Sequence, residues 1–271
     1  MPATSKAVIL ARGLGSRMRR ADAAARVDES QARVADAGMK AMIPIGRPFL
    51  DHVMSGLADA GITDVCLVIG PEHGAIRDYY ASLALRRVRV HFATQATANG
   101  TAGAVAAAEH FAAGDTVLIL NGDNYYPAAA CHALAQLGES GTVGFEASGL
   151  IAKSNIPSDR IRMFALLQRD DDGRLTGVVE KPDPMVYELL LRRSLISMNL
   201  WSFSPVIYDA CRRVTPSVRG ELELQDAVRI AMTEFGESFR VLESDDGVLD
   251  LSTRGDIDSV SAVLRDRPVR L

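Results

Sequence analysis

The stretch LARGLGSRMRR, residues 10–20, places two glycines and four arginines directly after a short apolar run, residues 7–10. Glycines let the backbone turn sharply and approach a ligand closely, and the amide groups exposed by such a turn attract anions. Arg17 follows Gly13 and Gly15, and its guanidinium can bind two phosphate oxygens at once. Glycine turns after strands are common, however. The stretch is therefore either a tight solvated turn or a site that holds several phosphates.

Two well-known phosphate-binding patterns do not fit this stretch. The dinucleotide pattern G-x-G-x-x-G needs a glycine where Met18 stands, and the P-loop needs a Gly-Lys-Ser or Gly-Lys-Thr sequence that does not occur here. If the stretch binds phosphate, it uses a different arrangement.

Two aspartates stand at the ends of apolar segments far apart in the chain. Asp123 lies in LILNGDN, residues 118–124, and Asp250 lies in GVLDLST, residues 247–253. Open α/β sheets bind ligands beyond the carboxyl ends of their strands, and carboxylates there suit Mg²⁺, which prefers oxygen ligands and bridges phosphates. An aspartate in a glycine turn is also frequent without any metal. If the two side chains converge, they predict a Mg²⁺ site.

A further pair of charges ends the segment VVEKP, residues 178–182. Glu180 and Lys181 stand just before a proline that stops the predicted strand. Lys181 is either a lone surface charge or a point charge for a substrate phosphate.

The sequence predicts an α/β fold to position these residues, because short β-rich runs alternate with helical stretches. Several runs are apolar throughout, which predicts strands buried on both faces and hence a parallel sheet flanked by helices. A turn at DDDG, residues 170–173, predicts a hairpin. Strands are expected at 7–10, 65–70, 88–92, 116–120, 141–145, 163–168, 175–180 and 195–203, and helices at 49–57, 102–111 and 223–235.

Length and composition restrict the class of protein. The 271 residues are 48% hydrophobic and 24% charged, as in an ordinary globular protein, and no linker or repeat interrupts them, so a single domain over 1–271 is expected. The net charge of -4 gives no reason to expect nucleic acid or an anionic membrane as a partner. No signal peptide or membrane-length apolar run is visible, and the three cysteines have no metal or disulfide spacing. We expect a cytoplasmic protein with buried free thiols.

The segment 19–38 differs from the rest in being rich in alanine, with interleaved arginines and acids. This composition favours a solvated helix or a mobile flap over a core element. Its place beside the glycine loop is compatible with a lid, and equally with a plain surface insertion.

Taken in order, the motifs resemble those of the sugar-1-phosphate nucleotidylyltransferases, from about residue 6 to about residue 260. The matching motifs are the glycine loop with its arginine, a lysine in GMKAMIPIG, QATANGTA, NGD, EKP, ELELQD and GVLDLST. That family joins a nucleoside triphosphate to a sugar 1-phosphate and releases pyrophosphate, with Mg²⁺ as cofactor. The resemblance implies a Rossmann-like, mixed and mostly parallel sheet with flanking helices and a small sugar-binding subdomain.

The resemblance also implies roles for particular residues. Arg17, Lys40 and Lys181 match catalytic positions, and Asp123 and Asp250 match the pair that holds the metal. The nucleotide-binding positions are Leu10, Ala11, Gly13, Gly15, Gln95, Gly100, Thr101 and Gly122. The sugar-phosphate positions are Glu180, Lys181, Ala165, Asn199 and Glu221.

Three departures from the family pattern stand out. Arg12 lies between Ala11 and Gly13 where the family has a small residue, and it either adds a phosphate contact or points to solvent. Met39 replaces the proline before Lys40, and the 19–38 segment, which is atypical of the family, lengthens the gap to Arg17. The family carries Tyr-Gly and Gly-Ile-Tyr where this chain has Phe164-Ala165 and Asn199-Leu200-Trp201. The identity of the sugar can therefore not be assigned from any one subfamily.

The leading hypothesis is an active enzyme with a nucleoside triphosphate and a sugar 1-phosphate as partners, as a monomer or a homo-oligomer. One alternative is a regulatory homologue that binds a nucleotide sugar without catalysis. Another is a glycosyltransferase, although that class would carry Asp-x-Asp where Asn121-Gly122-Asp123 stands. The base is open between uridine, thymidine, cytidine and guanosine, and glucose is only the commonest sugar.

Overall fold

Neighbouring residues of strand β1 (Lys6–Leu10) face opposite sides of the central sheet, and both sides are buried. Ala7 and Ile9 belong to one hydrophobic core, which also contains residues of α3 (Phe49–Asp59) and α7 (Ala128–Gln136). Val8 belongs to a second core with α5 (Thr101–Ala107), α11 (Val206–Arg213) and α12 (Leu224–Glu234). This burial on two faces explains why the strand is apolar throughout.

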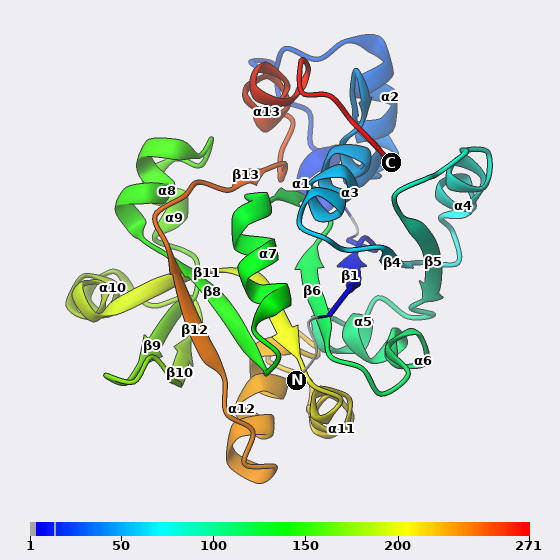
Figure 1. The fold of residues 1–271 in the computed structure, drawn as a ribbon. Coiled ribbons are helices and arrows are strands. Elements are labelled where there is room, and N and C mark those ends of the chain that lie inside the picture. The colour runs from blue at the N-terminus through cyan, green and yellow to red at the C-terminus, as the bar shows by residue number, and fades with distance from the viewer. Residues whose placement is uncertain (1–3, 14) are drawn as a thin grey trace.

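Within the part of the chain that the structure describes, the central sheet has nine strands and a mixed topology (Figure 1). The computed structural model describes residues 4–13 and 15–271. The sheet order is β10-β9-β11-β6-β1-β4-β5, with β8 beside β11 and β12 beside β8. The pairs formed by β6, β1, β4 and β5 are all parallel, whereas β11 is antiparallel to each of its neighbours. These four parallel strands are β1, β4 (Asp64–Ile69), β5 (Arg89–Thr94) and β6 (Val117–Asn121).

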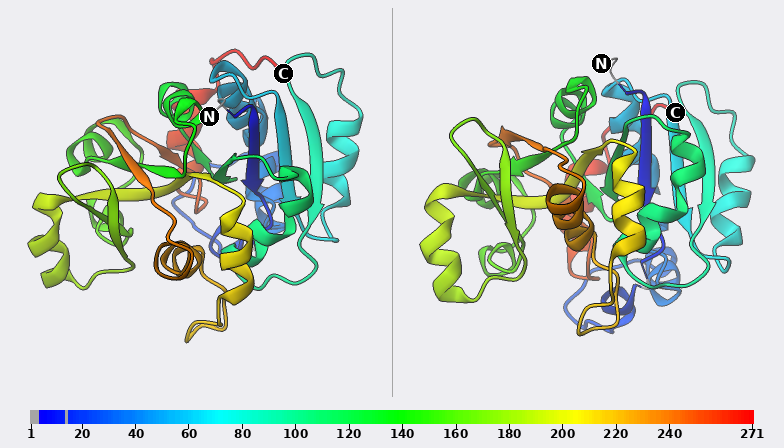
Figure 2. Two further views of the ribbon diagram at one scale, coloured as in Figure 1. Left: turned by 60° about the horizontal axis from the view of Figure 1, so that its bottom comes forward. Right: turned by 90° about the horizontal axis from the view of Figure 1, so that it is seen from below.

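The second half of the chain extends this sheet beyond β11 (Ser194–Phe203). The DDDG turn closes the antiparallel pair β9 (Leu166–Arg169) and β10 (Leu175–Val179), as the sequence predicted. Together with α10 (Pro184–Leu190), this hairpin lies at the opposite end of the molecule from β5 and α4 (Gly74–Ala81) (Figure 2).

The remaining strands of the sheet are β8 (Gly141–Phe145) and β12 (Arg240–Ser244). Short two-residue strands are β2 (Pro44–Ile45), β3 (Arg47–Pro48), β7 (Asn124–Tyr125) and β13 (Leu249–Asp250). The remaining helices are α1 (Ser16–Arg19), α2 (Glu29–Asp36), α6 (Glu109–Ala112), α8 (Ala147–Lys153), α9 (Ser158–Ile161), α13 (Asp256–Leu264) and the 3-10 turns η1 (Lys40–Met42) and η2 (Leu191–Arg193).

The predicted fold class is confirmed, with two corrections to individual elements. The helix expected at 102–111 is two helices, because the chain breaks at Ala108 between α5 and α6. The strand expected from residue 163 starts only at Leu166, because α9 and the turn that follows it come first.

The segment 19–38 is more firmly attached than its composition suggested. Its helix α2 begins at a capping box in which the Asp28 carboxylate accepts from the amide of Gln31 and the Gln31 side chain accepts from the amide of Asp28. Gln31 is buried and its side chain donates to the carbonyl of Pro44 at 3.0 Å. Arg254 donates to the carbonyl of Met18 at 2.9 Å and also pairs with Asp36. The helix expected as one alternative is therefore present with an exposed face, and the buried Gln31 and Ala35 attach its other face to the protein.

The cysteines are free and buried, as expected: Cys66, Cys131 and Cys211. Burial raises the pKa of each thiol to about 12, so the thiols stay protonated at neutral pH. Among the described residues, no helix combines the length and apolar character that a membrane crossing requires.

An ion pair between β4 and β5 gives a pH-dependent contribution to stability. Arg89 donates two hydrogen bonds, of 2.7 and 2.6 Å, to the Asp64 carboxylate, and these bonds lower the pKa of Asp64 to about 2. Because the folded pKa lies below the unfolded value of 3.8, the contribution is present above about pH 4 and is lost as the pH falls towards 2.

We expect Asp64→Asn to lower the free energy of unfolding at pH 7 by about 1 kcal/mol, a modest value because Arg89 is exposed to solvent. Urea unfolding at a series of pH values should show a constant gap to the unmodified protein from pH 5 to 8, and a shrinking gap below pH 4. A gap of the same size at pH 2.5 would contradict the assignment.

Candidate nucleotide-binding site

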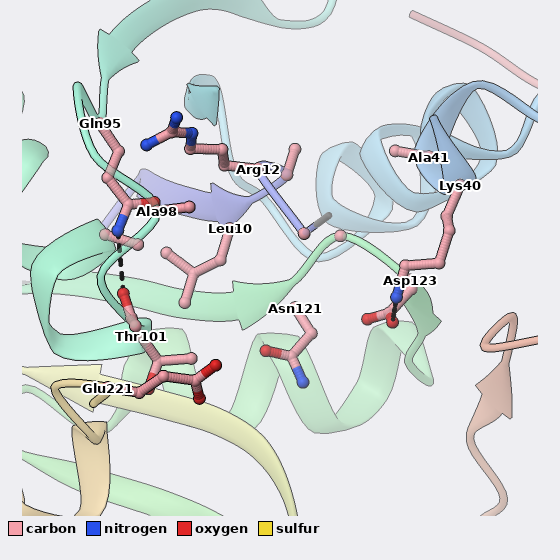
Figure 3. Close-up of a pocket in the computed structure, with 15 residues that line it drawn as sticks. Leu10, Arg12, Lys40, Ala41, Gln95, Ala98, Thr101, Asn121, Asp123 and Glu221 are labelled. Carbon is pink, nitrogen blue, oxygen red and sulfur yellow. Dashed lines mark hydrogen bonds and ion pairs between the residues drawn. The ribbon is translucent and has the colours of Figure 1, made fainter. Parts of the chain in front are cut away.

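The carboxyl ends of β1, β5 and β6 open into one cavity of about 280 Å³ (Figure 3). The loop after β1 is held over its neighbours by two backbone hydrogen bonds. The Ala11 amide donates to the carbonyl of Val68 at 2.9 Å, and the Gly122 amide donates to the carbonyl of Leu10 at 3.0 Å. The cavity therefore lies where parallel sheets usually bind ligands. It is lined by Leu10, Ala11, Arg12, Gly13, Lys40, Ala41, Gln95, Ala98, Gly100, Thr101, Ala104, Asn121, Gly122, Asp123 and Glu221.

One end of the cavity is built around Gln95 and the start of α5. Gln95 is buried, and its Nε2 donates to Asn99 Oδ1 and to the carbonyl of Gly100, both at 2.9 Å. Gly100 has a φ of 109°, and a side-chain carbon there would lie 2.5 Å from the backbone nitrogen and oxygen of Leu222. Only glycine permits both this conformation and this close approach.

The other end of the cavity carries opposite charges. Lys40 Nζ pairs with the carboxylate of Asp123, and the Lys40 side chain runs beside Gly13 (Figure 3). The lysine comes from the turn η1, whereas the aspartate follows β6. A cation and a carboxylate at one end of the cavity are suited to phosphates and to a cation that accompanies them.

Asp250 lies next to Asp123, although it does not line the cavity. The Leu251 amide donates to the carbonyl of Asp123 at 2.8 Å, and Asp250 pairs with Asn124 across the short β13–β7 ladder. Burial, together with the neighbouring Asp123 carboxylate, raises the pKa of Asp250 to about 6. Arg160 partly compensates, with its Nη2 3.1 Å from the Asp250 carboxylate.

The two carboxylates fit a divalent cation by their chemistry. Mg²⁺ is usually held by one or two carboxylates together with waters and substrate phosphates, and two carboxylates close together repel each other unless a cation lies near them. No cluster of three or more His, Cys, Asp or Glu side chains suitable for a metal occurs within residues 4–13 and 15–271. A cation here would therefore need the phosphate oxygens of a ligand to complete its coordination.

The residues assigned to the sugar phosphate lie outside this cavity, except for Glu221. Ala165 is buried, and its carbonyl accepts from the Ser197 amide of β11 at 2.9 Å. Asn199 lies in the irregular part of β11 and accepts from Gln225 of α12 at 3.1 Å. Glu180 and Lys181 are exposed at the end of β10. Asn199 and Lys181 have positive φ values of 55° and 42°, and such strain in non-glycine residues is concentrated at functional sites.

The structure separates the predicted nucleotide residues into two groups. Leu10, Ala11, Gly13, Gln95, Gly100, Thr101 and Gly122 line the cavity, as do Lys40 and Asp123. Gly15 and Arg17 do not line it. Gly15 has a φ of 62°, and a side-chain carbon there would lie 2.2 Å from the carbonyl oxygen of Gly38, so it serves packing against the 19–38 segment. Arg17 is exposed on α1.

Four lining residues were not singled out from the sequence: Ala41, Ala98, Ala104 and Asn121. The three alanines carry no chemical signal in the sequence. Asn121 lies inside the NGD motif and could have been included because of its position two residues before Asp123.

The fold and the site define a class of protein with known relatives. The protein in the solved structure of a UDP-glucose pyrophosphorylase complexed with UDP-glucose superposes with a TM-score of 0.73, covering 98% of this chain and 100% of that one at 16% identity. This likeness shows the nucleotide-diphospho-sugar transferase fold.

The family is shown by sequence. The family model described as nucleotidyl transferase matches residues 33–262, and this chain belongs to that family. UTP–glucose-1-phosphate uridylyltransferase AglF of Haloferax volcanii is 26% identical over 262 residues, which are 96% of this chain and 97% of AglF. The low-salt glycan biosynthesis nucleotidyltransferase Agl11 of the same organism is 27% identical over 226 residues, 83% of this chain but only 56% of Agl11. The chain therefore spans little more than half of Agl11 and nearly the whole of AglF.

Proposed function

We propose that this protein transfers a nucleotidyl group from a nucleoside triphosphate to a sugar 1-phosphate, giving a nucleotide sugar and pyrophosphate. The observation that carries the proposal is a cavity at the carboxyl edge of the parallel strands. It combines buried Gln95 at one end with the Lys40–Asp123 pair at the other. The names of relatives such as AglF support the same reaction.

The reaction needs charge neutralisation and positioning more than acid–base catalysis. An oxygen of the sugar phosphate attacks the α-phosphorus, a new P–O bond forms, and the bond to the pyrophosphate breaks as that group leaves with its electron pair. Both reactants are polyanions that repel each other, so bringing them together accounts for much of the barrier. In the proposed complex Lys40 releases Asp123 and binds phosphate oxygens, and Lys181 approaches the sugar phosphate from the hairpin.

Mg²⁺ is part of the proposal. When bound, it would neutralise negative charge on the nucleotide phosphates. Asp123 and Asp250 would hold it, with Arg160 fixing the orientation of the Asp250 carboxylate. Treatment with EDTA is expected to abolish turnover, and added Mg²⁺ should restore it without a change in the far-UV circular dichroism.

A pyrophosphate-release assay tests the reaction. UTP, dTTP, CTP, GTP and ATP are each combined with glucose 1-phosphate and with other sugar 1-phosphates, in the presence of Mg²⁺. At least one pair should give turnover that depends on both substrates. No turnover with any pair in a folded sample would contradict the proposal, and tight binding of a nucleotide sugar without Mg²⁺ would instead favour the regulatory alternative.

A further inference from the structure

Asn155 lies between α8 and α9, outside the cavity lining, and the proposed reaction gives it no role. Its side chain nevertheless forms two hydrogen bonds with the main chain of Asp250. Asn155 Oδ1 accepts from the Asp250 amide at 2.8 Å, and Asn155 Nδ2 donates to the Asp250 carbonyl at 2.9 Å. One side-chain amide thus satisfies both main-chain groups of a residue that is only 4% exposed.

These two hydrogen bonds take the place of those that a neighbouring strand would form. Asp250 belongs to β13, which within the described part of the chain pairs with β7 alone. The Leu251 amide donates to β7, at the carbonyl of Asp123, so the amide and carbonyl of Asp250 face the other side of β13. Buried main-chain groups need partners, and asparagine offers a donor and an acceptor together, as a peptide group does.

The carboxylate of Asp250 is held almost as completely as its main chain. Oδ1 accepts from Asn124 at 3.2 Å and from the Ser252 hydroxyl at 2.9 Å. Oδ2 lies 3.1 Å from Arg160 Nη2. A carboxylate has about four acceptor positions, so one remains, on Oδ2. A cation bound by Asp250 must use this position, and its direction depends on how the residue is held.

The segment that carries Asn155 packs closely against the chain that runs from β12 into β13 (Figure 1). A side-chain carbon at Gly247 would lie 2.1 Å from the carbonyl oxygen of Lys153, and one at Gly149 would lie 2.1 Å from the carbonyl oxygen of Asp245. Only glycine allows main chains to approach this closely. The position of Asn155 relative to β13 is therefore set by packing of main chain against main chain.

The same segment supplies the arginine that faces the carboxylate. Arg160 of α9 donates to Asp256 in two hydrogen bonds, of 3.0 and 3.2 Å. The Asp256 carboxylate also accepts from the amides of Ser252 and Thr253, at 3.0 and 2.7 Å. The loop 250–256 is thus a rigid unit, and the segment 155–160 holds it at the carboxylate and at the main chain of Asp250.

We propose that Asn155 is a positioning residue for the cation that accompanies the nucleotide. It fixes the main chain of Asp250 and thereby keeps the remaining acceptor position of Oδ2 in one direction. The inference rests on the proposed function and its Mg²⁺ site. Residues that hold a metal ligand without touching the metal typically change metal affinity by about 10–100-fold when they are replaced.

Binding of Mn²⁺, a paramagnetic substitute for Mg²⁺, tests the assignment without any turnover. The full chain is titrated with the Mn²⁺ complexes of UTP, dTTP, CTP, GTP and ATP, and binding is followed by the relaxation rate of water protons. Calorimetry with the same nucleotides in EDTA measures binding without a cation. Asn155→Ala removes both hydrogen bonds. Asn155→Asp keeps the shape and the acceptor, but a carboxylate oxygen replaces the donor.

Ser259→Ala is the matched control. Asn155 Nδ2 also lies 3.3 Å from Ser259 Oγ, so this variant removes a contact of the same amide group and leaves both hydrogen bonds to Asp250 in place. Ser259 is exposed on α13, where alanine fits a helix. This variant should bind every Mn²⁺ complex as the unmodified chain does.

In Asn155→Ala the affinity for the tightest-binding Mn²⁺ complex should fall about tenfold or more. The affinity for the metal-free nucleotide should stay within about twofold, because Asn155 does not line the cavity. Asn155→Asp should also bind the Mn²⁺ complex less tightly. Its added negative charge would by itself attract a cation, so a loss in this variant reports the orientation of Asp250. If Asn155→Ala does not fold, Asn155→Asp decides alone.

Three results would overturn this inference. Unchanged affinity of a folded Asn155→Ala variant for the Mn²⁺ complex would show that Asp250 needs no such anchor. Equal losses with and without Mn²⁺ would make Asn155 a support of the whole cavity. Tighter binding of the Mn²⁺ complex by Asn155→Asp would show that charge governs the site. An unmodified chain that binds no Mn²⁺ complex contradicts the proposed function itself, so the two failures are distinguishable.

Discussion

Asp123→Asn is expected to lower kcat/KM for pyrophosphate release by about 10³-fold or more, because the variant lacks a carboxylate that would hold the cation neutralising the phosphates. The amide has nearly the same volume, so the NGD turn should keep its conformation. It removes the negative charge that pairs with Lys40 and that would hold the metal beside Asp250. The variant should therefore lose most of its turnover, and the residual turnover should need higher Mg²⁺ concentrations.

The matched control is Asp115→Asn. Asp115 also pairs with a lysine, Lys6, but it is exposed, precedes β6 rather than following it, and does not line the cavity. This variant should keep full activity. Activity of Asp123→Asn within tenfold of the unmodified chain, in a sample with unchanged circular dichroism, would exclude the carboxylate from catalysis.

Gly100→Ala is expected to give the largest loss of stability, lowering the free energy of unfolding by about 2–5 kcal/mol. About 1–3 kcal/mol comes from placing a side chain at a φ of 109°, and about 1–3 kcal/mol from overpacking against the Leu222 backbone at 2.5 Å. Backbone atoms cannot yield as the end of a flexible side chain can. Thermal unfolding should show a midpoint lowered by about 5–15 °C for a chain of this size.

Gly114→Ala is the control that separates the cost of the backbone conformation from the cost of the contact with Leu222. Gly114 has a similar φ of 86°, but a side-chain carbon there meets nothing within 4 Å. It should cost about 1 kcal/mol. Equal losses in the two variants would show that the approach of Leu222 contributes nothing. A larger loss for Gly100→Ala, together with weaker nucleotide binding, would support its place in the cavity wall.

The sequence predicted the parallel half of the fold well, because burial on both faces leaves continuous apolar runs. Asp123 was predicted to lie at a ligand site because it follows a strand whose carboxyl end lies at the edge where such sheets bind ligands. Gln95 and Gly100 were predicted only from the resemblance to the family. The break at Ala108 was missed because alanine favours helix on both sides of it.

Other features of the structure depend on contacts between residues distant in the sequence. The docking of α2 depends on Gln31 reaching Pro44 and on Arg254 reaching Met18 and Asp36, and local composition carries no trace of these contacts. Gly15 looked like a ligand-binding glycine because nothing in the chain marks Gly38 as its packing partner. The direction of Arg12 depends on Glu72, sixty residues further along.

The backbone around Leu222 connects the nucleotide cavity with the region proposed to bind the sugar phosphate. Its amide donates to the carbonyl of Asn99 at 2.7 Å and its carbonyl accepts from the amide of Ala102 at 2.9 Å, while its neighbour Glu221 lines the cavity. Two residues on, Leu224 begins α12, whose Gln225 holds Asn199. If a bound nucleotide orders the segment 221–225, it also changes the affinity for the sugar phosphate. By thermodynamic linkage, the sugar phosphate then changes the affinity for the nucleotide by the same factor. The two substrates are thus expected to bind cooperatively, through a shared segment of main chain.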